Sequence, residues 1–228
     1  MTFPIEIEDL HFRYNGSERE ILSGINICID KGEVVAVVGL SGKGKSTLCY
    51  CISGIIPHIF SGNLFGKVRI NGISTTDMSV AQIATKLGVV FQDPDTQLFS
   101  PTVEDELAFG PENLCLNRDE IGRRIEESLY LVGMQDHRYD NPNQLSGGQK
   151  QLISIASVLC LKPDILILDE VMAQVDKDGK QRIKQVIKSL RDEGKTIVMV
   201  EHDINNLDIA DKVVLLKEGK LERFCGNL

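Results

Sequence analysis

Hydrophobic and polar residues alternate near the start of the chain and give way to continuous apolar runs further along. The alternating apolar positions are Ile5, Ile7, Leu10, Phe12 and Tyr14, and later Ile25, Ile27 and Ile29. A two-residue period predicts half-buried antiparallel strands, because successive side chains of a strand point to opposite faces. The unbroken run Val34–Val38 predicts instead a central strand that is covered on both faces.

The segments after this run predict more strand and then a short helix. Lys67–Ile70, closed by an Asn-Gly pair, indicates another strand and a turn, which would complete a small β layer. Ser79 followed by Gln82 is a helix-start signal, because each side chain can satisfy a free backbone N–H of the first turn. Leu87–Phe91 then predicts a return to the sheet.

Residues 93–144 differ from their surroundings because they contain several prolines and a helical apolar period. The apolar face consists of Ile121, Ile125, Leu129 and Val132. We therefore expect a mostly helical insertion here. A further helix is predicted from Ser146 to a point before Pro163, where proline ends it.

Strands and helices alternate again in the last third of the chain. The predicted elements are a strand at Ile165–Leu168, a helix at Lys180–Leu190, a strand at Thr196–Val200 and a hairpin of Lys212–Leu216 with Leu221–Phe224. This order is typical of an α/β fold with a parallel sheet.

The composition fits one domain and excludes some classes of function. The chain has 228 residues, 42% of them hydrophobic, with a formal charge of −8. That charge argues against a surface that neutralises a nucleic-acid backbone, so we expect no nucleic-acid partner. The longest apolar runs fall far short of the roughly 20 residues of a membrane helix. No export signal is visible at the start, which predicts a cytoplasmic protein.

The cysteines lack the spacing of a disulfide framework or redox motif. They are Cys28, Cys49, Cys51, Cys115, Cys160 and Cys225. Most have apolar neighbours, so we expect reduced thiols in the core. Cys49 and Cys51 would lie about 200° apart on their helix, which disfavours a shared metal ion.

A phosphate-binding loop follows the buried run at Val34–Val38. Its residues are Gly39-Leu40-Ser41-Gly42-Lys43-Gly44-Lys45-Ser46-Thr47, which fit G-x-x-x-x-G-K-[ST] between a strand and a helix. Glycines let backbone N–H groups curl around a β-phosphate. We expect Lys45 to reach the β- and γ-phosphates of ATP and the Ser46 hydroxyl to bind Mg²⁺.

Two more segments place groups suited to phosphate chemistry at the ends of elements. Asp169 and Glu170 follow an apolar strand, where ligands gather in open α/β sheets. We expect Asp169 to hold Mg²⁺ and Glu170 to polarise the attacking water, with helix capping as the alternative role. Leu145-Ser146-Gly147-Gly148-Gln149 forms a second helix start at which an anion could bind.

With these motifs in this order, the chain resembles the nucleotide-binding subunit of an ATP-binding-cassette (ABC) transporter. The resemblance implies an α/β fold with a P-loop nucleoside-triphosphatase core of the RecA-like type, an N-terminal antiparallel β subdomain and an inserted α-helical subdomain. Residues 1–92 and 160–228 would form the core and 93–159 the helical subdomain of one domain spanning 1–228. In that family two cassettes enclose two ATP molecules head to tail, so Ser146, Gly147, Gly148 and Gln149 would contact the partner's nucleotide.

Further residues resemble family positions one at a time. Tyr14 resembles the aromatic residue that stacks on adenine, and Gln92 the glutamine that touches Mg²⁺ and links the core to the insertion. His202 resembles the switch histidine that contacts the γ-phosphate and supports Glu170, and Asp176 the acid of the interface loop. The alternatives are a strand-end surface residue for Tyr14, a polar loop residue for Gln92 and a structural histidine for His202. The implied catalytic residues are Lys45, Gln92, Glu170 and His202, and the implied Mg²⁺ ligands are Ser46, Gln92 and Asp169.

Two parts of the chain depart from the family pattern. After Glu170 the usual Pro-Thr is absent, and the segment reads Val171-Met172-Ala173-Gln174-Val175-Asp176. Gln174 and Val175 put in doubt how tightly the interface loop couples the two sites, although Asp176 keeps the family's acid. Lys43 stands where a small residue is usual, and it either supplies charge near the phosphates or faces solvent, of which we favour the second.

The segment Phe91–Asn113 resembles the ATPases of energy-coupling-factor importers, which take up vitamins and cobalt or nickel. Their two ATPases dock beneath an integral membrane scaffold that works with a membrane substrate-binding subunit, at the cytoplasmic side of the cell membrane. By this resemblance Gln97–Val103 would help form the groove for the scaffold. From spacing alone, Leu98, Phe99 and Val103 fit a small subdomain core equally well.

Other functions remain open at this stage. An ATPase of a conventional ABC importer or exporter would share these motifs. A cassette ATPase that acts on DNA or ribosomes is a hypothesis of another class, disfavoured by the acidic charge and by the absence of coiled-coil heptads. Both half-sites occur in one chain, so the second ATPase subunit could be identical or different, and the membrane partners would select the substrate.

Overall fold

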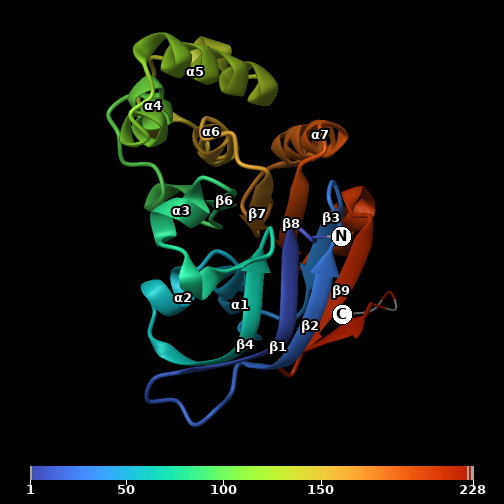
Figure 1. Cartoon of the computed structure of the whole chain (residues 1–228). Coiled ribbons are helices and arrows are strands. Elements are labelled where there is room, and N and C mark those ends of the chain that lie inside the picture. The colour runs from blue at the N-terminus through green and yellow to red at the C-terminus, as the bar shows by residue number, and fades with distance from the viewer. Residues whose placement is uncertain (1, 225, 227–228) are drawn as a thin grey trace.

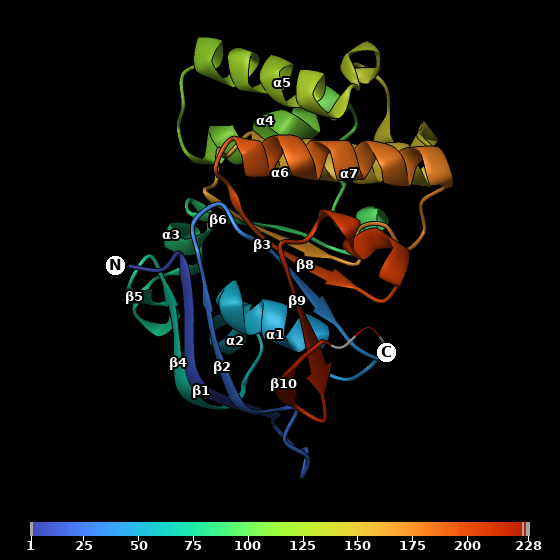
Figure 2. The same ribbon diagram turned by 90° about the vertical axis from the view of Figure 1, so that its right-hand side faces the viewer.

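Helices cover both faces of a central six-stranded sheet in the computed structural model, which describes residues 2–224 and 226 (Figures 1 and 2). The strand order is β10-β9-β3-β8-β7-β6. Strands β9, β3, β8, β7 and β6 run parallel to one another, and β10 is antiparallel to its neighbour β9. Their bounds are β3 (Val34–Val38), β6 (Leu87–Val90), β7 (Ile165–Asp169), β8 (Thr196–Glu201), β9 (Lys212–Lys217) and β10 (Lys220–Arg223).

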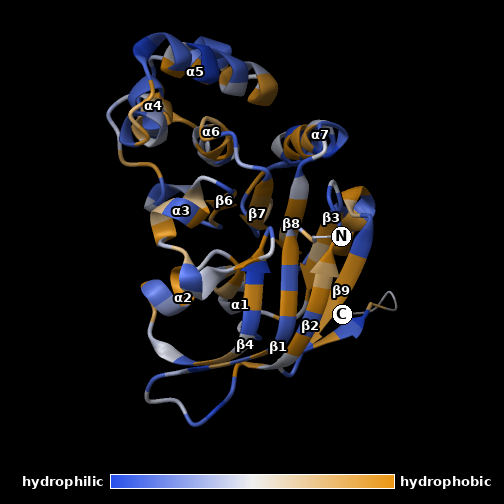
Figure 3. Ribbon diagram, in the orientation of Figure 1, coloured by the Kyte–Doolittle hydropathy of each residue, from blue (hydrophilic) through white to orange (hydrophobic). Residues whose placement is uncertain are grey.

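A second, antiparallel sheet has the order β2-β1-β4-β5 and contains the alternating segments near the start of the chain. Its strands are β1 (Ile5–Tyr14), β2 (Leu22–Ile29), β4 (Gly62–Ile70) and β5 (Ile73–Ser74). Hydrophobic and hydrophilic residues alternate along β1, as its colour bands show (Figure 3). The expected β layer is confirmed.

Strand β4 begins at Gly62, earlier than the predicted Lys67. The difference arises at a register shift in β1 between Glu8 and His11, where Asp9 has a φ of 45°. Gly66 lies opposite with a φ of 85°, and a Cβ there would come within 2.2 Å of the Asp9 oxygen. Such a bulge interrupts the alternation from which strand bounds are read.

The helices are divided between the two sides of the central sheet. Those near the β layer are α1 (Lys45–Ile52), α2 (Ile55–His58) and α3 (Val80–Ala84); the others are α4 (Val103–Asn113), α5 (Arg118–Val132), α6 (Gly147–Leu159) and α7 (Lys177–Asp192). Short 3₁₀ turns lie between these helices and the strands: η1 (Thr75–Asp77), η2 (Pro94–Thr96), η3 (Gln135–His137), η4 (Pro142–Gln144) and η5 (Ile204–Ile209). The predicted helical insertion is present as α4 and α5.

The central sheet separates two hydrophobic cores. In β3, Val34, Ala36 and Val38 pack on the side of α6 and α7, whereas Val35 and Val37 pack against α1 and the antiparallel sheet. All five are buried, as expected for a strand covered on both faces. The strand ends of this doubly covered sheet are therefore the part open to a ligand.

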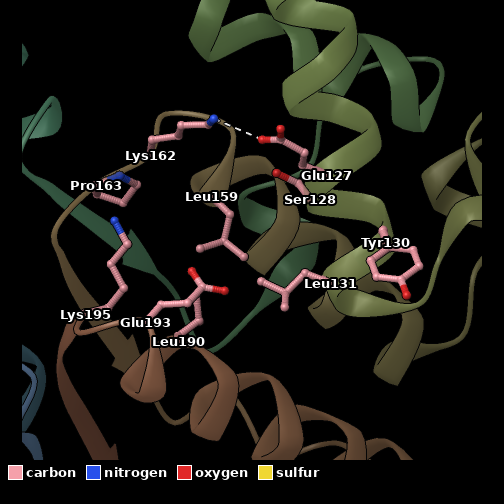
Figure 4. A pocket seen from close by; sticks show the side chains of 10 residues that line it. All are labelled: Glu127, Ser128, Tyr130, Leu131, Leu159, Lys162, Pro163, Leu190, Glu193 and Lys195. Carbon is pink, nitrogen blue, oxygen red and sulfur yellow. Dashed lines mark ion pairs between the residues drawn. The ribbon is translucent and has the colours of Figure 1, made fainter.

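A hollow of about 480 Å³ lies where α5 faces the ends of α6 and α7 (Figure 4). Leu131, Leu159 and Leu190 line it. At its edge, Lys162 Nζ lies 2.9 Å from Glu127 Oε2 and ties the α6 end to α5. The helical insertion is thus incompletely packed against the sheet layer along this boundary.

Two of the cysteines depart from the expected core location. Cys49, Cys51 and Cys160 are buried, but Cys28 and Cys115 are exposed. Cys28 lies on a strand face that points away from the core, and Cys115 lies in the turn after α4. Cys225 is outside the described residues. Burial raises the pKa of the Cys51 thiol to about 12, which disfavours the thiolate that binds metals.

None of the described helices has the length and apolar character needed to cross a membrane.

Candidate functional site

The phosphate loop forms one wall of a cleft of about 310 Å³ at the strand ends. Tyr14, Gln92 and Glu170 line the same cleft, together with Ser41, Gly42 and the segment 44–47. Residues far apart in the sequence therefore meet where the motif predicts. Ile21 also lines the cleft, and no sequence motif singled it out. Lys43 is half-buried and is not among the lining residues.

Two glycines of the loop are required by close approach of other segments. Gly39 has a φ of 154°, and a Cβ there would lie 2.5 Å from the Leu216 oxygen. Gly44 has a φ of 102°, and its Cβ would come within 2.9 Å of the Ile21 side chain. These conformations suit glycine alone and let the loop turn directly from β3 into α1.

The Lys45 ammonium is held across the mouth of the loop. It donates to the Gly39 oxygen at 3.0 Å and the Leu40 oxygen at 3.3 Å. It also lies 3.3 Å from Glu170 Oε1. The side chain is buried, so its charge acts at short range on whatever enters the cleft.

Glu170 connects the lysine with the histidine at the end of the next strand. It follows β7 with a φ of 51°, and its backbone N–H donates to the Val200 oxygen at 3.1 Å. Glu170 Oε2 lies 3.6 Å from His202 Nδ1. The carboxylate thus lies between the Lys45 ammonium and the His202 imidazole at the edge of the cleft.

Asp169 is the buried member of the acid pair and has an unsatisfied oxygen. Its Oδ1 has no hydrogen-bond partner among the described residues. Burial raises the pKa of this carboxyl, and a hydrogen bond from Ser46 opposes the shift. A free carboxylate oxygen beside a serine hydroxyl is a set of hard oxygen donors, which suits Mg²⁺.

Tyr14 lies at the edge of the cleft and is positioned by two contacts. Its hydroxyl and Thr47 Oγ1 are 3.1 Å apart. Its ring packs edge to face against Phe12, with centroids 4.8 Å apart. The tyrosine is therefore fixed beside the loop and half-buried, with part of its ring left accessible.

Gln92 is exposed, in a loop that is fixed at the preceding residue. The Phe91 N–H donates to Gln97 Oε1 at 3.1 Å, and the Phe91 oxygen accepts from Gln151 Nε2 at 3.1 Å. The second contact comes from α6, so the loop between sheet and insertion is bonded directly to the helix that begins within the Leu145–Gln149 motif.

That motif starts α6 and lies apart from the phosphate loop. Ser146 Oγ accepts from the Gln149 N–H, and Gln149 Oε1 accepts from the Ser146 N–H, which forms a capping box. None of residues 145–149 is among those that line the cleft. The helix start at Ser146 therefore lies outside the cleft that the phosphate loop lines.

Asp176 begins the neighbouring helix α7 as its N-cap. Its Oδ1 accepts from the Gly179 N–H at 2.8 Å, and a Cβ on Gly148 would lie 3.9 Å from the same oxygen. In the unusual segment before it, Val171 and Met172 are buried in the core, while Gln174 is exposed. Val171 and Met172 thus pack into the core where the family pattern has Pro-Thr.

Gln97–Val103 was expected either to help form a groove for a membrane scaffold or to belong to a small subdomain core, and the structure divides the segment between a buried and an exposed part. Val103 is fully buried in the core and Leu98 packs against it. Phe99 is 67% exposed and meets Phe109, itself 48% exposed, edge to face at 4.9 Å. Val103 thus belongs to the subdomain core, and the Phe99–Phe109 pair forms an apolar surface.

Comparison with known proteins gives matches along almost the whole chain. The family model described as ABC transporter matches residues 22–173. A putative ABC transporter ATP-binding protein of Methanosarcina acetivorans is 48% identical over 95% of this chain and 34% of its own length. The energy-coupling factor transporter ATP-binding protein EcfA of the same organism is 40% identical over 95% and 77%. The chain thus spans about a third of the first relative.

Solved structures match the fold closely. CbiO1 of Clostridium perfringens, described as part of the ABC transporter complex CbiONQ, has a TM-score of 0.87 and 34% identity over 97% of this chain and 88% of its own. The dimeric cassette MJ0796, in a post-hydrolysis state with ADP and Pi, has a TM-score of 0.84 and 29% identity over 96% and 97%.

Proposed function

The chain belongs to the ABC transporter family of ATP-binding proteins, and on that premise we propose that it is the ATPase subunit of an energy-coupling-factor importer. The observation that carries the proposal is the division of the phosphate-binding groups. The Lys45 cleft and the Ser146 helix start occur in one chain but do not share a site. Two copies placed head to tail would complete two sites.

Within each site the residues have distinct roles in ATP hydrolysis. Lys45 binds the β- and γ-phosphates, and Tyr14 stacks on the adenine. Glu170 accepts a proton from the attacking water, and His202 orients that carboxylate from the other side. Catalysis of phosphoryl transfer is mostly positioning and charge stabilisation, which fits a site of buried charges on rigid strand ends.

Ser46, Asp169 and Gln92 are the residues that would hold Mg²⁺. The unsatisfied Asp169 Oδ1 and the neighbouring serine hydroxyl provide oxygen ligands, and Gln92 can approach from its exposed loop. The ion, when bound, neutralises charge that develops on the transferring phosphate.

The partner copy supplies Ser146, Gly147 and Gly148 to the γ-phosphate through backbone N–H groups and the helix dipole. Gln149 holds the serine, and Asp176 lies beside this surface. Because both sets of residues occur in one chain, a homodimer would complete both sites, and so would a heterodimer with a related cassette. The dimer is the unit that responds to ATP.

The helical insertion transmits this closure to membrane subunits on the cytoplasmic side of the membrane. The exposed Phe99–Phe109 pair provides an apolar surface for an integral membrane scaffold. The hollow between α5 and α7 leaves room for the insertion to shift against the sheet layer. A second membrane subunit would bind the vitamin or transition-metal ion.

The decisive experiment removes the proposed base. Glu170→Gln is expected to slow ATP hydrolysis on the order of 10²–10⁴-fold and to give an ATP-stabilised dimer in light scattering. Glu18→Gln, at an exposed position, is the control and should behave as the wild type. Normal hydrolysis by Glu170→Gln, without an ATP-dependent dimer, would contradict the assignment. Co-purification with a scaffold subunit from membranes tests the importer branch.

A further inference from the structure

A histidine from outside the motif contacts the helix start at Ser146. His137, in η3, has its Nε2 3.1 Å from Gln149 Nε2. Its other ring nitrogen, Nδ1, lies 2.7 Å from Asp140 Oδ2. Gln149 in turn bonds Ser146 in the capping box. Four residues thus form one chain of hydrogen bonds that runs from Asp140 to Ser146.

The groups at the two ends of this series of hydrogen bonds, the Ser146 N–H and the Asp140 carboxylate, determine which atom donates in each bond. Gln149 Oε1 accepts from the Ser146 N–H at 2.9 Å, so the amide NH₂ group must face His137. Since that group can only donate, His137 Nε2 must accept with its lone pair. The proton of the neutral ring therefore sits on Nδ1, which donates to Asp140. Only one protonation state of His137 fits.

We propose that His137 is a positioning residue for the Ser146 helix start, and that it does so only as the neutral Nδ1–H imidazole. The neutral ring holds the Gln149 amide in the orientation that caps Ser146. A second proton on Nε2 would place two donors face to face. The amide would then turn over and present NH₂ to the Ser146 N–H, which breaks the cap. The proposal rests on the proposed function, in which Ser146 acts on the partner's ATP.

The groups around His137 contact it through its two hydrogen-bonded ring nitrogens. Asp140 follows in the same segment, and α6 contributes the neutral Gln149. Arg138 points to Glu104 of α4 and forms an ion pair with it. The imidazole ring is about one third exposed, at 32%, so protons reach it from solvent.

The test uses the Glu170→Gln protein, whose ATP-stabilised dimer reports on the helix start without turnover. His137→Leu removes the acceptor and is expected to weaken the dimer on the order of tenfold at about pH 8. His137→Gln keeps a terminal carbonyl acceptor and should restore dimerisation to within about threefold. His11→Gln is the matched control, because His11 bonds Asp9 and Glu20 on the distant β layer.

The pH dependence separates positioning from a general loss of structure. When the pH falls from about 8 to about 6, the dimer affinity of the parent should decrease. The decrease for His137→Gln should be smaller than that for the parent, by a factor on the order of ten. His202 is present in the parent and in every variant, so its effect cancels when the dimer affinity of a variant is divided by that of the parent at the same pH. Nitrogen-15 shifts of the His137 ring should show the Nδ1–H tautomer at the higher pH, and circular dichroism should show folded variants.

The possible results distinguish this inference from the proposed function. A parent protein that dimerises with ATP while His137→Leu and His137→Gln follow it at both pH values would overturn the inference alone. An Nε2–H tautomer at the higher pH would overturn it as well. A parent that forms no dimer with ATP at either pH would contradict the proposed function, and the inference would fall with it.

Discussion

Lys45 Nζ and Glu170 Oε1 lie 3.3 Å apart at the mouth of the phosphate loop, with the lysine side chain 4% and the glutamate side chain 16% exposed. The residue proposed to bind phosphate is therefore paired with the residue proposed to activate water. A γ-phosphate bound to Lys45 would compete for this contact. Glu170 would then be released toward the attacking water and His202, which couples substrate binding to the availability of the base.

The first prediction concerns the two lysines of the loop. Lys45→Met should weaken ATP binding by about 2–5 kcal/mol, because it removes a buried cation and leaves Glu170 without its closest partner. Lys43→Met should change ATP affinity by less than about threefold, because Lys43 does not line the cleft. Isothermal titration calorimetry with ATP measures both. Equal losses for the two variants would show that loop charge, and not the position of Lys45, determines binding.

The second prediction separates the ring of Tyr14 from its hydroxyl. Tyr14→Ala should weaken binding of ATP and ADP alike by about 0.5–1.5 kcal/mol, because the stacking surface for the base is lost. Tyr14→Phe keeps the ring and loses only the hydrogen bond to Thr47, so its affinity should stay near that of the wild type. Fluorescent-nucleotide titration gives both constants. A Tyr14→Phe protein as weak as Tyr14→Ala would assign the effect to Thr47 instead.

The third prediction uses Glu201, a buried carboxyl at the end of β8. One oxygen accepts from Asn206 Nδ2 at 3.1 Å, and the other has no partner among the described residues. Burial raises the pKa of Glu201, and the Asn206 bond opposes the shift. A raised pKa favours the fold while the group is protonated, and this contribution is lost as the pH rises through that pKa.

Glu201→Gln should therefore melt at a higher temperature than the wild type at about pH 8, and the difference should shrink or reverse at about pH 5. Each 1 kcal/mol corresponds to roughly 2–4 °C for a chain of this size. Differential scanning calorimetry at the two pH values measures this difference in melting temperature, with Glu18→Gln as the exposed control. A difference that grows as the pH falls would have the wrong sign for a raised pKa.

The sequence predicted the strands and the loop well because their signals are local. Val34–Val38 is fully apolar and is buried on both faces, and Ser79 with Gln82 forms the expected capping box. The start of β4 was misplaced because a bulge at Asp9 breaks the alternation. Bulges depend on the partner strand, here on Gly66, and a single-strand pattern contains no information about the partner.

The site shows the same division between local and long-range information. The phosphate loop and the acid pair could be singled out from the sequence because each is a short motif with a mechanism, and Lys45 and Glu170 line the same cleft. The contact of His137 with Gln149 joins residues 12 positions apart through a loop, and no periodicity marks it. Exposed Cys28 was expected in the core from its apolar neighbours, but the strand face that it occupies points outward. Composition cannot specify a face.

The last prediction concerns the link between the Gln92 loop and α6. Lys150 Nζ lies 2.5 Å from Asp95 Oδ1, which joins η2 to the helix that starts at Ser146. The lysine is 15% exposed and the aspartate 63%, so the pair should contribute near the upper end of the range for surface ion pairs. A double-mutant cycle of Asp95→Ala and Lys150→Ala should give a coupling free energy of about 0.5–1 kcal/mol in urea unfolding. This coupling should fall in about 1 M salt, where charges are screened within roughly 3 Å. The pair Arg191 and Asp192, with side chains 34% and 70% exposed, is the control and should show less coupling. A coupling indistinguishable from zero at low salt would mean that the Gln151 bond to Phe91, and not this ion pair, joins the loop to the helix.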